Sequence, residues 1–358
     1  MTTKEKHVAV ALSGGLDSAV AAALLKKENH QVIALHFRTG YESLLGGTDS
    51  SDQLSSLDSW AERVAEQIDI PFEVIDCSEV FESEVVGYFV DAYRSGQTPN
   101  PCMVCNKLVK FGLMFEEAKA RGASVLATGH YARVRREENG RFHLIKGEDQ
   151  TKDQSYFLAL LNQEQLSGAL FPLGTYTKKQ VKEMAGSFGL TSFRAGESQE
   201  LCFVGEPNYK EFLSKHTGLP DKPGTIVNRK GDVIGRHNGL HAYTVGQRKG
   251  INIPGPAPYY VLRLDQENNQ LVIGSKPELA ATECLVKEIN WIGIEPPDKP
   301  ISVQTRIRYR HQEADSTLTP LDHDSATVRF SEPQYAITPG QAAVFYQGDR
   351  VLGGGWIE

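Results

Sequence analysis

The chain has 358 residues, of which 40% are hydrophobic and 23% charged, a composition typical of a soluble protein with two or three domains. Its formal net charge of −7 at pH 7 argues against a general nucleic-acid binder, which needs a basic surface. Five cysteines are too few, and odd in number, for a disulfide scaffold, and no apolar run is long enough to cross a membrane. We therefore expect a cytoplasmic protein with no membrane partner.

The first half of the chain alternates short apolar stretches with helical patterns. The expected strands are 7–12, 31–37, 72–77 and 124–131, and the expected helices lie near 19–29, 57–69, 80–95 and 107–121. Repeated strand–helix units predict an α/β fold with an open, doubly wound, mostly parallel sheet. Ligands of such sheets bind beyond the carboxyl ends of the strands.

The second half changes from helices to short strands. A hairpin is predicted over 131–149 because Asn139–Gly140 is a strong turn signal, and helices are expected near 152–166 and 176–188. After about residue 206, Pro, Gly and Asn separate short strands, which predicts two small β-rich or β-barrel domains. The predicted domains are 1–205, 206–280 and 281–358.

Residues 13–18, SGGLDS, interrupt the apolar pattern between the first strand and the first helix. Gly14 and Gly15 permit a tight turn and close approach of the backbone to a ligand, and a helix N-terminus offers free N–H groups to a phosphate. A plain turn capped by Asp17 or Ser18 would explain the same residues without a ligand. The segment is neither a Walker loop nor a dinucleotide fingerprint. It resembles the pyrophosphate loop of the ATP pyrophosphatases, which adenylate a carbonyl oxygen; this implies that Asp17 engages magnesium.

Cys102 and Cys105 form a C-x-x-C motif ahead of a predicted helix. With Lys107 and Lys110 nearby, a thiol beside a helix N-terminus is predicted to have a depressed pKa and to be more ionised. Half of a zinc site with Cys202, a redox pair and two inert thiols are alternatives that the pattern leaves open.

The other cysteines have simpler interpretations. Cys202 can be a third functional thiol or a small apolar residue beside Phe203. Cys77 and Cys284 lie at predicted strand ends and are interpreted as core or edge residues.

A closer resemblance covers almost the whole chain. It is carried, in this order, by SGGLDS, TPNPCMVCNKLVKF, ATGHYARV, KDQSYFL, LCFVGE, HAYTVGQRKG, TRIRYR, TPGQAAVFY and LGGGWI. Together these segments resemble the bacterial tRNA-specific 2-thiouridylases, which belong to the PP-loop ATP pyrophosphatases and have an adenine nucleotide alpha hydrolase-like fold. The resemblance implies a tRNA-uridine 2-sulfurtransferase that adenylates the 2-carbonyl of the wobble uridine, position 34, and transfers sulfur from a cysteine persulfide. It implies ATP and Mg²⁺ as cofactors, and tRNA and a persulfide donor protein (a cysteine desulfurase or a relay protein) as partners.

The resemblance also implies a role for each matching residue. Cys105 would be the nucleophile, and Cys202 would carry the persulfide and then form a disulfide with Cys105. The ATP site would comprise Ala11, Leu12, Ser13, Gly14, Gly15, Leu16, Asp17, Ser18, Phe37 and Gly129. The target base would contact Asn100, Pro101 and Cys102, and the rest of the tRNA would contact His130, Lys152, Asp153, Gln154, Arg308, Tyr309 and Gln341.

Three other functions stay open from the sequence. Some relatives have an aspartate in place of Cys102, and three thiolates at Cys102, Cys105 and Cys202 suit an iron–sulfur-dependent thiolase. An adenylating ligase or amidase with a nitrogen nucleophile would not need these thiols. An RNA-binding module using the loop only as a switch would bind ATP without releasing pyrophosphate.

Local basic segments reconcile the acidic chain with an RNA partner. Residues 222–249 carry six lysines and arginines against one acidic residue, Asp232, and RIRYRH spans 306–311. Either segment alone is better explained as a solvated loop.

Overall fold

The computed structural model describes residues 6–42, 54–191, 201–204, 209–217 and 222–358. The chain divides into two compact units. The first comprises Met1–Val86, Pro101–Glu206 and Asp349–Val351, and the second comprises Gly87–Asn100, Pro207–Gly348 and Leu352–Glu358. Across the described residues, no helix has both the length and the apolar character that crossing a membrane requires.

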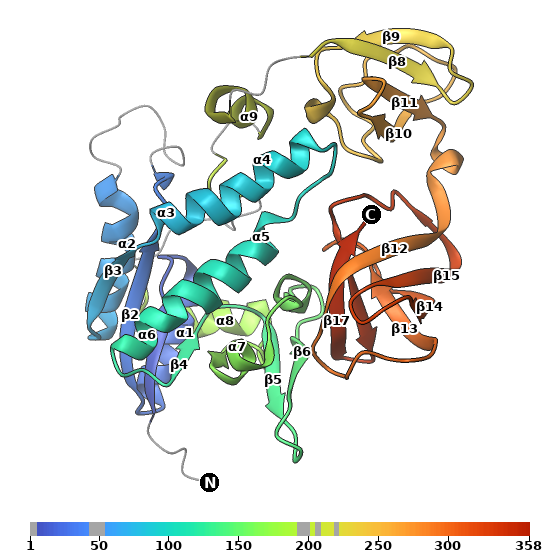
Figure 1. The fold of residues 1–358 in the computed structure, drawn as a ribbon. Helices are drawn as coiled ribbons and strands as arrows, with labels where there is room; N and C mark the ends of the chain where they lie inside the picture. The colour runs from blue at the N-terminus through green and yellow to red at the C-terminus, as the bar shows by residue number, and fades with distance from the viewer. Residues whose placement is uncertain (1–5, 43–53, 192–200, 205–208, 218–221) are drawn as a thin grey trace. The chain divides into compact units, whose positions relative to one another are not determined.

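The first unit is built on a parallel sheet with the strand order β3-β2-β1-β4-β7 (Figure 1). The strands are β1 (His7–Ala11), β2 (Gln31–Arg38), β3 (Phe72–Asp76), β4 (Val125–Ala127) and β7 (Ala169–Leu170). In register, Val8 of β1 pairs with Val32 of β2 and Val125 of β4. The parallel sheet is confirmed. The predicted strand 124–131 was too long, because only three of its residues pair before the chain leaves the sheet.

Helices cover both faces of this sheet. They are α1 (Leu16–Lys27), α2 (Leu54–Ile68), α3 (Ser78–Val80) with the π-helix η2 (Phe81–Val86), α5 (Pro101–Val104), the π-helix η3 (Cys105–Leu113), α6 (Met114–Ala120), the 3-10 helix η4 (Ser155–Leu158), α7 (Gln163–Ser167) and α8 (Lys178–Ser187). Val8 and Val10 belong to a core cluster with residues of α1, α2 and α8. Ala9, between them, faces the other side, and α6 packs on β1, β2 and β4. The doubly wound α/β arrangement is therefore confirmed.

A hairpin extends the first unit. β5 (Ala132–Arg136) pairs antiparallel with β6 (Phe142–Lys146) around Gly140, whose φ of +87° is the left-handed conformation that glycine adopts without strain. The predicted turn at Asn139–Gly140 is confirmed. Arg350, also in this unit, pairs with Ile145 of β6.

In the described residues, the second unit contains the two β modules together with the α-helices α4 (Gly87–Arg94) and α9 (Tyr209–Thr217). Tyr93 stacks on Tyr209 at 5.1 Å between ring centroids. The first module has the strand order β10-β11-β8-β9, formed by β8 (Gly224–Asn228), β9 (Val233–His237), β10 (Tyr260–Asp265) and β11 (Gln270–Gly274), with the 3-10 helices η5 (Leu240–Ala242) and η6 (Lys276–Leu279). Ile226, Leu271 and Ile273 form its core.

The second β module is a closed barrel. Its strands are β12 (Ala280–Trp291), β13 (Ile301–Arg306), β14 (Ala314–Pro320), β15 (Ala326–Tyr335), β16 (Ala342–Gln347) and β17 (Arg350–Ile357). They follow the order β12-β15-β14-β13-β16-β17, and β12 also pairs with β17, which closes the ring. Val286, Val328 and Phe345 are fully buried inside it. The predicted α/β fold followed by small β domains is confirmed, and the exact domain boundaries stay a prediction.

Candidate functional site

The SGGLDS loop joins β1 to α1 at the carboxyl edge of the sheet. Gly14 has a φ of +73°, and a Cβ there would lie 3.1 Å from the Cβ of Trp60, so the turn requires glycine. Gly15 is the N-cap of α1 and supplies no side-chain acceptor to the first turn. Ser18 instead donates to the Gly15 carbonyl (3.0 Å) and accepts from the Ser13 backbone N–H (3.2 Å). Hydrogen bonds within the loop thus hold its conformation. The backbone N–H groups at the N-terminus of α1 have no side-chain cap and suit an anion.

Asp17 lies in the first turn of α1 and is not a cap. Its two carboxylate oxygens each accept from Nζ of Lys178 at 2.7 Å, and Oδ1 also accepts from the Tyr131 hydroxyl at 2.9 Å. A Cβ at Gly129 would lie 2.9 Å from backbone atoms of Asp17 and Ser18. Gly129, just beyond β4, therefore allows the chain to pack directly against the loop.

The other residues predicted for ATP follow from the strand order. Ala11 ends β1, Leu12 donates its N–H to Leu35 of β2 (2.9 Å), and Leu16 begins α1. Phe37 is the penultimate residue of β2, the strand next to β1, and is half-buried. The structure thus brings the predicted ATP residues to one edge of the sheet.

The C-x-x-C segment forms the start of a helix, with Pro101 at its first position, Cys102 next, and Cys105 opening η3. A π-helix is rare and is frequently found at functional sites. Cys105 is 6% exposed, Cys102 is half-buried and Cys202 is exposed; all five cysteines are free.

Burial controls the ionisation of these thiols. It raises the pKa of Cys105 to about 11 and also raises the pKa of Cys102; the protein atoms around the Cys202 sulfur likewise raise its pKa to about 12, although the residue as a whole is exposed. The Lys110 ammonium lowers all three pKa values, while the Cys102 and Cys105 thiols raise the pKa of Cys202. The three sulfurs are therefore electrostatic neighbours. The predicted depressed pKa is wrong, because Cys105 lies one turn inside the helix and its desolvation outweighs the attraction of Lys110.

Aromatic contacts hold the residue that follows Cys202. Phe203 is 1% exposed, and its ring contacts those of Phe81 (5.6 Å) and Tyr41 (6.1 Å) edge to face. The Tyr41 hydroxyl donates to Glu82 of η2. Cys202 is thus attached to a buried anchor. The nine residues before position 201 lie outside the described part of the chain.

His130 lies beside η3, the helix that begins at Cys105. Its Nδ1 is 2.6 Å from the Thr128 hydroxyl, and its ring packs against Phe111 and Phe171. Burial, with the Lys110 charge, holds the pKa of His130 well below its ordinary value. The imidazole of His130 is therefore neutral at pH 7.

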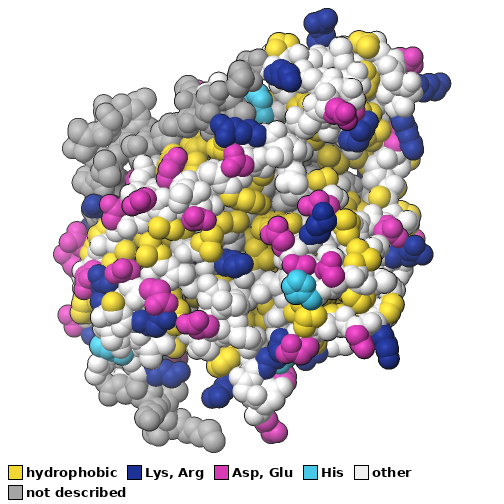
Figure 2. Space-filling model, viewed as in Figure 1, with side chains coloured by type: hydrophobic (Ala, Val, Ile, Leu, Met, Phe, Trp, Pro, Cys, Tyr) yellow, Lys and Arg dark blue, Asp and Glu magenta, His cyan; other side chains and the backbone are white. Residues whose placement is uncertain are grey.

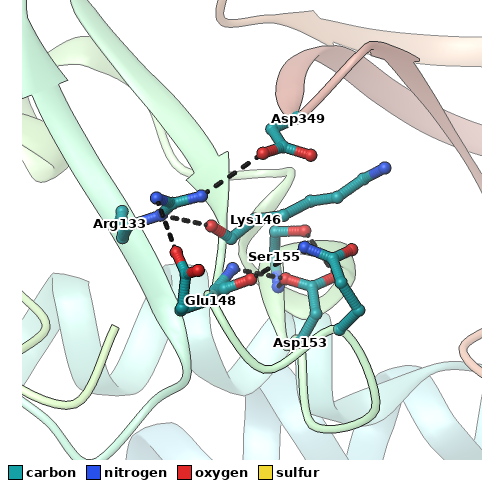
Figure 3. A network of polar contacts seen from close by, with 8 residues as sticks. Arg133, Lys146, Glu148, Asp153, Ser155 and Asp349 are labelled. Atoms are coloured by element: carbon teal, nitrogen blue, oxygen red, sulfur yellow. Dashed lines mark hydrogen bonds and ion pairs between the residues drawn. The ribbon is translucent and has the colours of Figure 1, made fainter. Parts of the chain in front are cut away.

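The predicted tRNA segment 152–154 forms a tightly bonded loop after the hairpin (Figure 3). The buried Asp153 carboxylate accepts from the backbone N–H groups of Gly147 (3.0 Å) and Ser155 (3.1 Å) and from the Ser155 hydroxyl (2.9 Å). Gln154 exchanges two hydrogen bonds with the backbone of Tyr131. At the hairpin base, Arg133 contacts Glu148 and Asp349.

The remaining predicted tRNA residues lie in the second unit. Gln341 donates to the carbonyls of Thr98 (3.0 Å) and Pro99 (3.1 Å), directly before the predicted base contact Asn100. Arg308 donates to the carbonyls of Tyr335 (3.0 Å) and Ala336 (3.4 Å), in the loop that leads to Gln341. The neighbouring residue Tyr309 is partly exposed. Gln341, at the barrel, therefore holds the backbone of residues 98–99, directly before Asn100.

Basic side chains cover the first β module. Its exposed members within 222–249 are Lys222, Arg229, Lys230, Arg236, Arg248 and Lys249. Figure 2 shows Lys and Arg side chains gathered over β8–β11, whereas the two charge signs are mixed over the first unit. The local positive region expected from the sequence is present.

Two residues of the site were missed from the sequence. Lys178 and Tyr131 both contact Asp17. Nothing near Asp17 in the sequence indicates these contacts, because Lys178 is 161 positions and Tyr131 is 114 positions away. The nearest clue was the Thr177-x-x-Gln180 capping box, which fixes where α8 begins. Among the described residues, only Asp322, His323 and Asp324 bring three possible metal-ligand atoms within 4.8 Å of one another, and this group contains no cysteine.

Three protein-family models match the chain in succession. They are the tRNA methyl transferase HUP domain at residues 6–206, the tRNA methyl transferase PRC-barrel domain at 210–275 and the aminomethyltransferase β-barrel domain at 281–357. A tRNA-specific 2-thiouridylase MnmA from Geobacter metallireducens is 47% identical, covering 100% of this chain and 98% of the relative. Proteins of the same name from Syntrophotalea carbinolica (44%, all of both chains) and a Synechococcus species (42%, 98% of this chain and 94% of the relative) are similar throughout.

Proposed function

The chain belongs to the tRNA-specific 2-thiouridylase family, and on this premise we propose that it is a sulfurtransferase that replaces the 2-oxygen of the wobble uridine of tRNA with sulfur. The observation that carries the proposal is the similarity to proteins of this name over the whole chain, all three modules included. The proposed modules are 1–205, 206–280 and 281–358. A nitrogen-nucleophile ligase and a nucleotide-switched RNA-binding module are not favoured by these relatives.

The first proposed step is activation of the uridine by ATP. The base oxygen attacks the α-phosphorus and pyrophosphate leaves, so that the oxygen later departs as part of AMP. The N-terminus of α1, which has no side-chain cap, and the tight glycine turn at Gly14 and Gly15 suit the β- and γ-phosphates. Mg²⁺, with Asp17 as its protein ligand, would neutralise charge on the phosphates.

The second proposed step is sulfur transfer. A persulfide on Cys202 attacks C2 of the activated base and displaces AMP, which leaves the base joined to Cys202 through two sulfurs. Cys105 as thiolate then attacks Sγ of Cys202, forms a Cys105–Cys202 disulfide and leaves one sulfur on the base. A dithiol reductant reopens the disulfide. The exposure of Cys202 suits loading by a donor protein, and the effect of the Cys105 thiol on the pKa of Cys202 supports the second attack.

Substrate placement is proposed for two groups of residues. Asn100, Pro101 and Cys102 would border the flipped base, because Gln341 fixes the preceding backbone and helix α5 begins directly after it. Lys152 to Gln154, His130, Arg308 and Tyr309 would contact the tRNA, with the exposed basic residues of the first β module binding phosphates. We place the protein in the cytoplasm, where its substrate is.

The test is mass analysis of tRNA nucleosides after incubation with ATP, Mg²⁺ and a persulfide source. The wild type should form 2-thiouridine, Cys105→Ser and Cys202→Ser should not, and Cys284→Ser, a buried thiol of the barrel, should retain activity. Absence of 2-thiouridine from the wild type would overturn the proposed function. Full activity of Cys202→Ser would exclude Cys202 as the persulfide carrier. If anaerobically purified wild type contained iron and the Cys105→Ser and Cys202→Ser variants did not, an iron–sulfur cluster mechanism would replace the persulfide mechanism.

A further inference from the structure

Lys178 reaches the SGGLDS loop from a distant part of the chain. It is the first residue of α8, whose start is fixed by the capping box of Thr177 and Gln180. The Lys178 backbone N–H donates to the carboxylate of Asp149 at 2.9 Å. The backbone of this lysine is therefore held on both sides, and its side chain extends to the loop.

The contact between Lys178 and Asp17 is more than an ordinary surface ion pair. Nζ lies 2.7 Å from both carboxylate oxygens, and the lysine side chain is only 12% exposed. Nζ also lies 5.8 Å from the centroid of the Tyr131 ring, whose hydroxyl binds the same carboxylate. Three short hydrogen bonds thus fix the position of the Asp17 carboxylate.

This arrangement answers an electrostatic problem in the loop. Residues 13–18 contain no basic side chain, and their one charged residue, Asp17, is negative. An uncompensated carboxylate beside a triphosphate would repel it, and the repulsion grows in a partly desolvated site. A buried ammonium on that carboxylate removes the repulsion while leaving the backbone N–H groups available for phosphate.

We propose that Lys178 is a positioning residue of the nucleotide site, which neutralises and orients Asp17 so that the loop can accept a nucleoside triphosphate. The inference rests on the proposed use of ATP. It assigns to a residue of α8, acting through Asp17, the positive charge that residues 13–18 lack. Tyr131 shares the orienting role because it binds the same carboxylate.

The experiment compares binding of a non-hydrolysable ATP analogue by four full-length variants: Lys178→Met, Asp17→Asn, the double variant, and the control Lys179→Met. Lys179 is the next residue of α8, but its side chain is 88% exposed and lies 3.9 Å from Glu183. Binding is measured by calorimetry with and without Mg²⁺, and thermal unfolding is measured in parallel. A Lys178→Gln variant, which keeps a hydrogen-bond donor without the charge, replaces Lys178→Met if the latter does not fold.

The expected pattern distinguishes charge compensation from a merely structural role. Without Mg²⁺, Lys178→Met should weaken analogue binding about tenfold or more, because an unpaired carboxylate then faces the phosphates. Mg²⁺ should reduce this loss, and the double variant should bind within about threefold of Asp17→Asn, since removing both charges removes the repulsion. Lys179→Met should bind as the wild type does.

Two results would overturn the inference. One is wild-type binding by Lys178→Met; the other is a double variant that binds no better than Lys178→Met, which would mean that Lys178 does not act through Asp17. If the wild type itself does not bind the analogue, the proposed function fails together with the inference, whereas either of the first two results leaves the proposed function intact.

Discussion

The ionisation of Cys105 gives the sharpest prediction, because Lys110 and burial act on it in opposite directions. Burial is the larger effect and raises the pKa to about 11, and Lys110 opposes it. At pH 8, about one Cys105 in a thousand is therefore a thiolate, compared with roughly a quarter of ordinary cysteines. The sulfur transfer proposed for Cys105 needs the thiolate, so the ionised fraction would limit its rate.

The perturbation is Lys110→Met, which removes the charge and keeps most of the side-chain volume. An opposite charge within a few ångströms shifts a pKa by about one unit or more, so the variant should hold about tenfold less thiolate at each pH. Lys107→Met, three residues earlier in the same helix, is the matched control.

The assay is site-specific alkylation of Cys105 by iodoacetamide, followed by peptide mass spectrometry between pH 7 and pH 10. In the wild type the rate should rise about tenfold per pH unit without a plateau, since the whole range lies below the pKa. Lys110→Met should follow a parallel line about tenfold lower. Limited access to the buried sulfur lowers both lines and leaves their slope unchanged. A plateau below pH 9 in the free enzyme would refute the reasoning and restore the depressed pKa expected from the sequence.

Three further predictions test separate parts of the site. Gly129→Ala should weaken binding of the ATP analogue and lower stability by about 1–3 kcal/mol, because its Cβ would lie 2.9 Å from the loop backbone; Gly186→Ala, with nothing within 4 Å, should not destabilise the protein by thermal unfolding. Phe203→Ala should slow the formation of 2-thiouridine while calorimetry shows unchanged ATP binding, because it loosens the aromatic anchor next to Cys202, the proposed persulfide carrier; an equal loss of 2-thiouridine formation and of ATP binding would contradict this assignment. Arg308→Ala should weaken tRNA binding and reduce the dependence of log affinity on log salt by about one, and an unchanged slope would exclude a phosphate contact.

Sequence patterns predicted the scaffold well because its signals are local. The alternation of apolar strands and helices predicted the parallel sheet, and Asn139–Gly140 predicted the hairpin turn. The strand β7 was missed because its two residues, Ala169–Leu170, carry no periodicity and pair only through contacts with β4. The continuous helix predicted near 152–166 was wrong, because a loop bonded to Asp153 precedes the short 3-10 helix η4, and residues 159–162 separate η4 from α7.

The chemistry of the site was harder to predict than its location. The sequence places Lys110 near Cys105, but it does not show that burial of the thiol exceeds the effect of that charge. Likewise, the loop residue Asp17 is visible from its motif, while its partner Lys178 is brought to it only by the packing of α8 on α1. Competing electrostatic effects depend on three-dimensional burial, which spacing along the chain does not encode.

The same contacts change how variants of the predicted tRNA segment should be interpreted. Tyr131 binds Asp17 through its hydroxyl and Gln154 through its backbone, and Lys178 joins Asp17 to Asp149 in the same way. The loop that includes Lys152 to Gln154 is therefore bonded to the nucleotide loop along two paths within one unit. A substitution at Gln154 removes a hydrogen bond from the backbone that orients Asp17, so a loss of activity there reports on RNA contact only when ATP binding is unchanged.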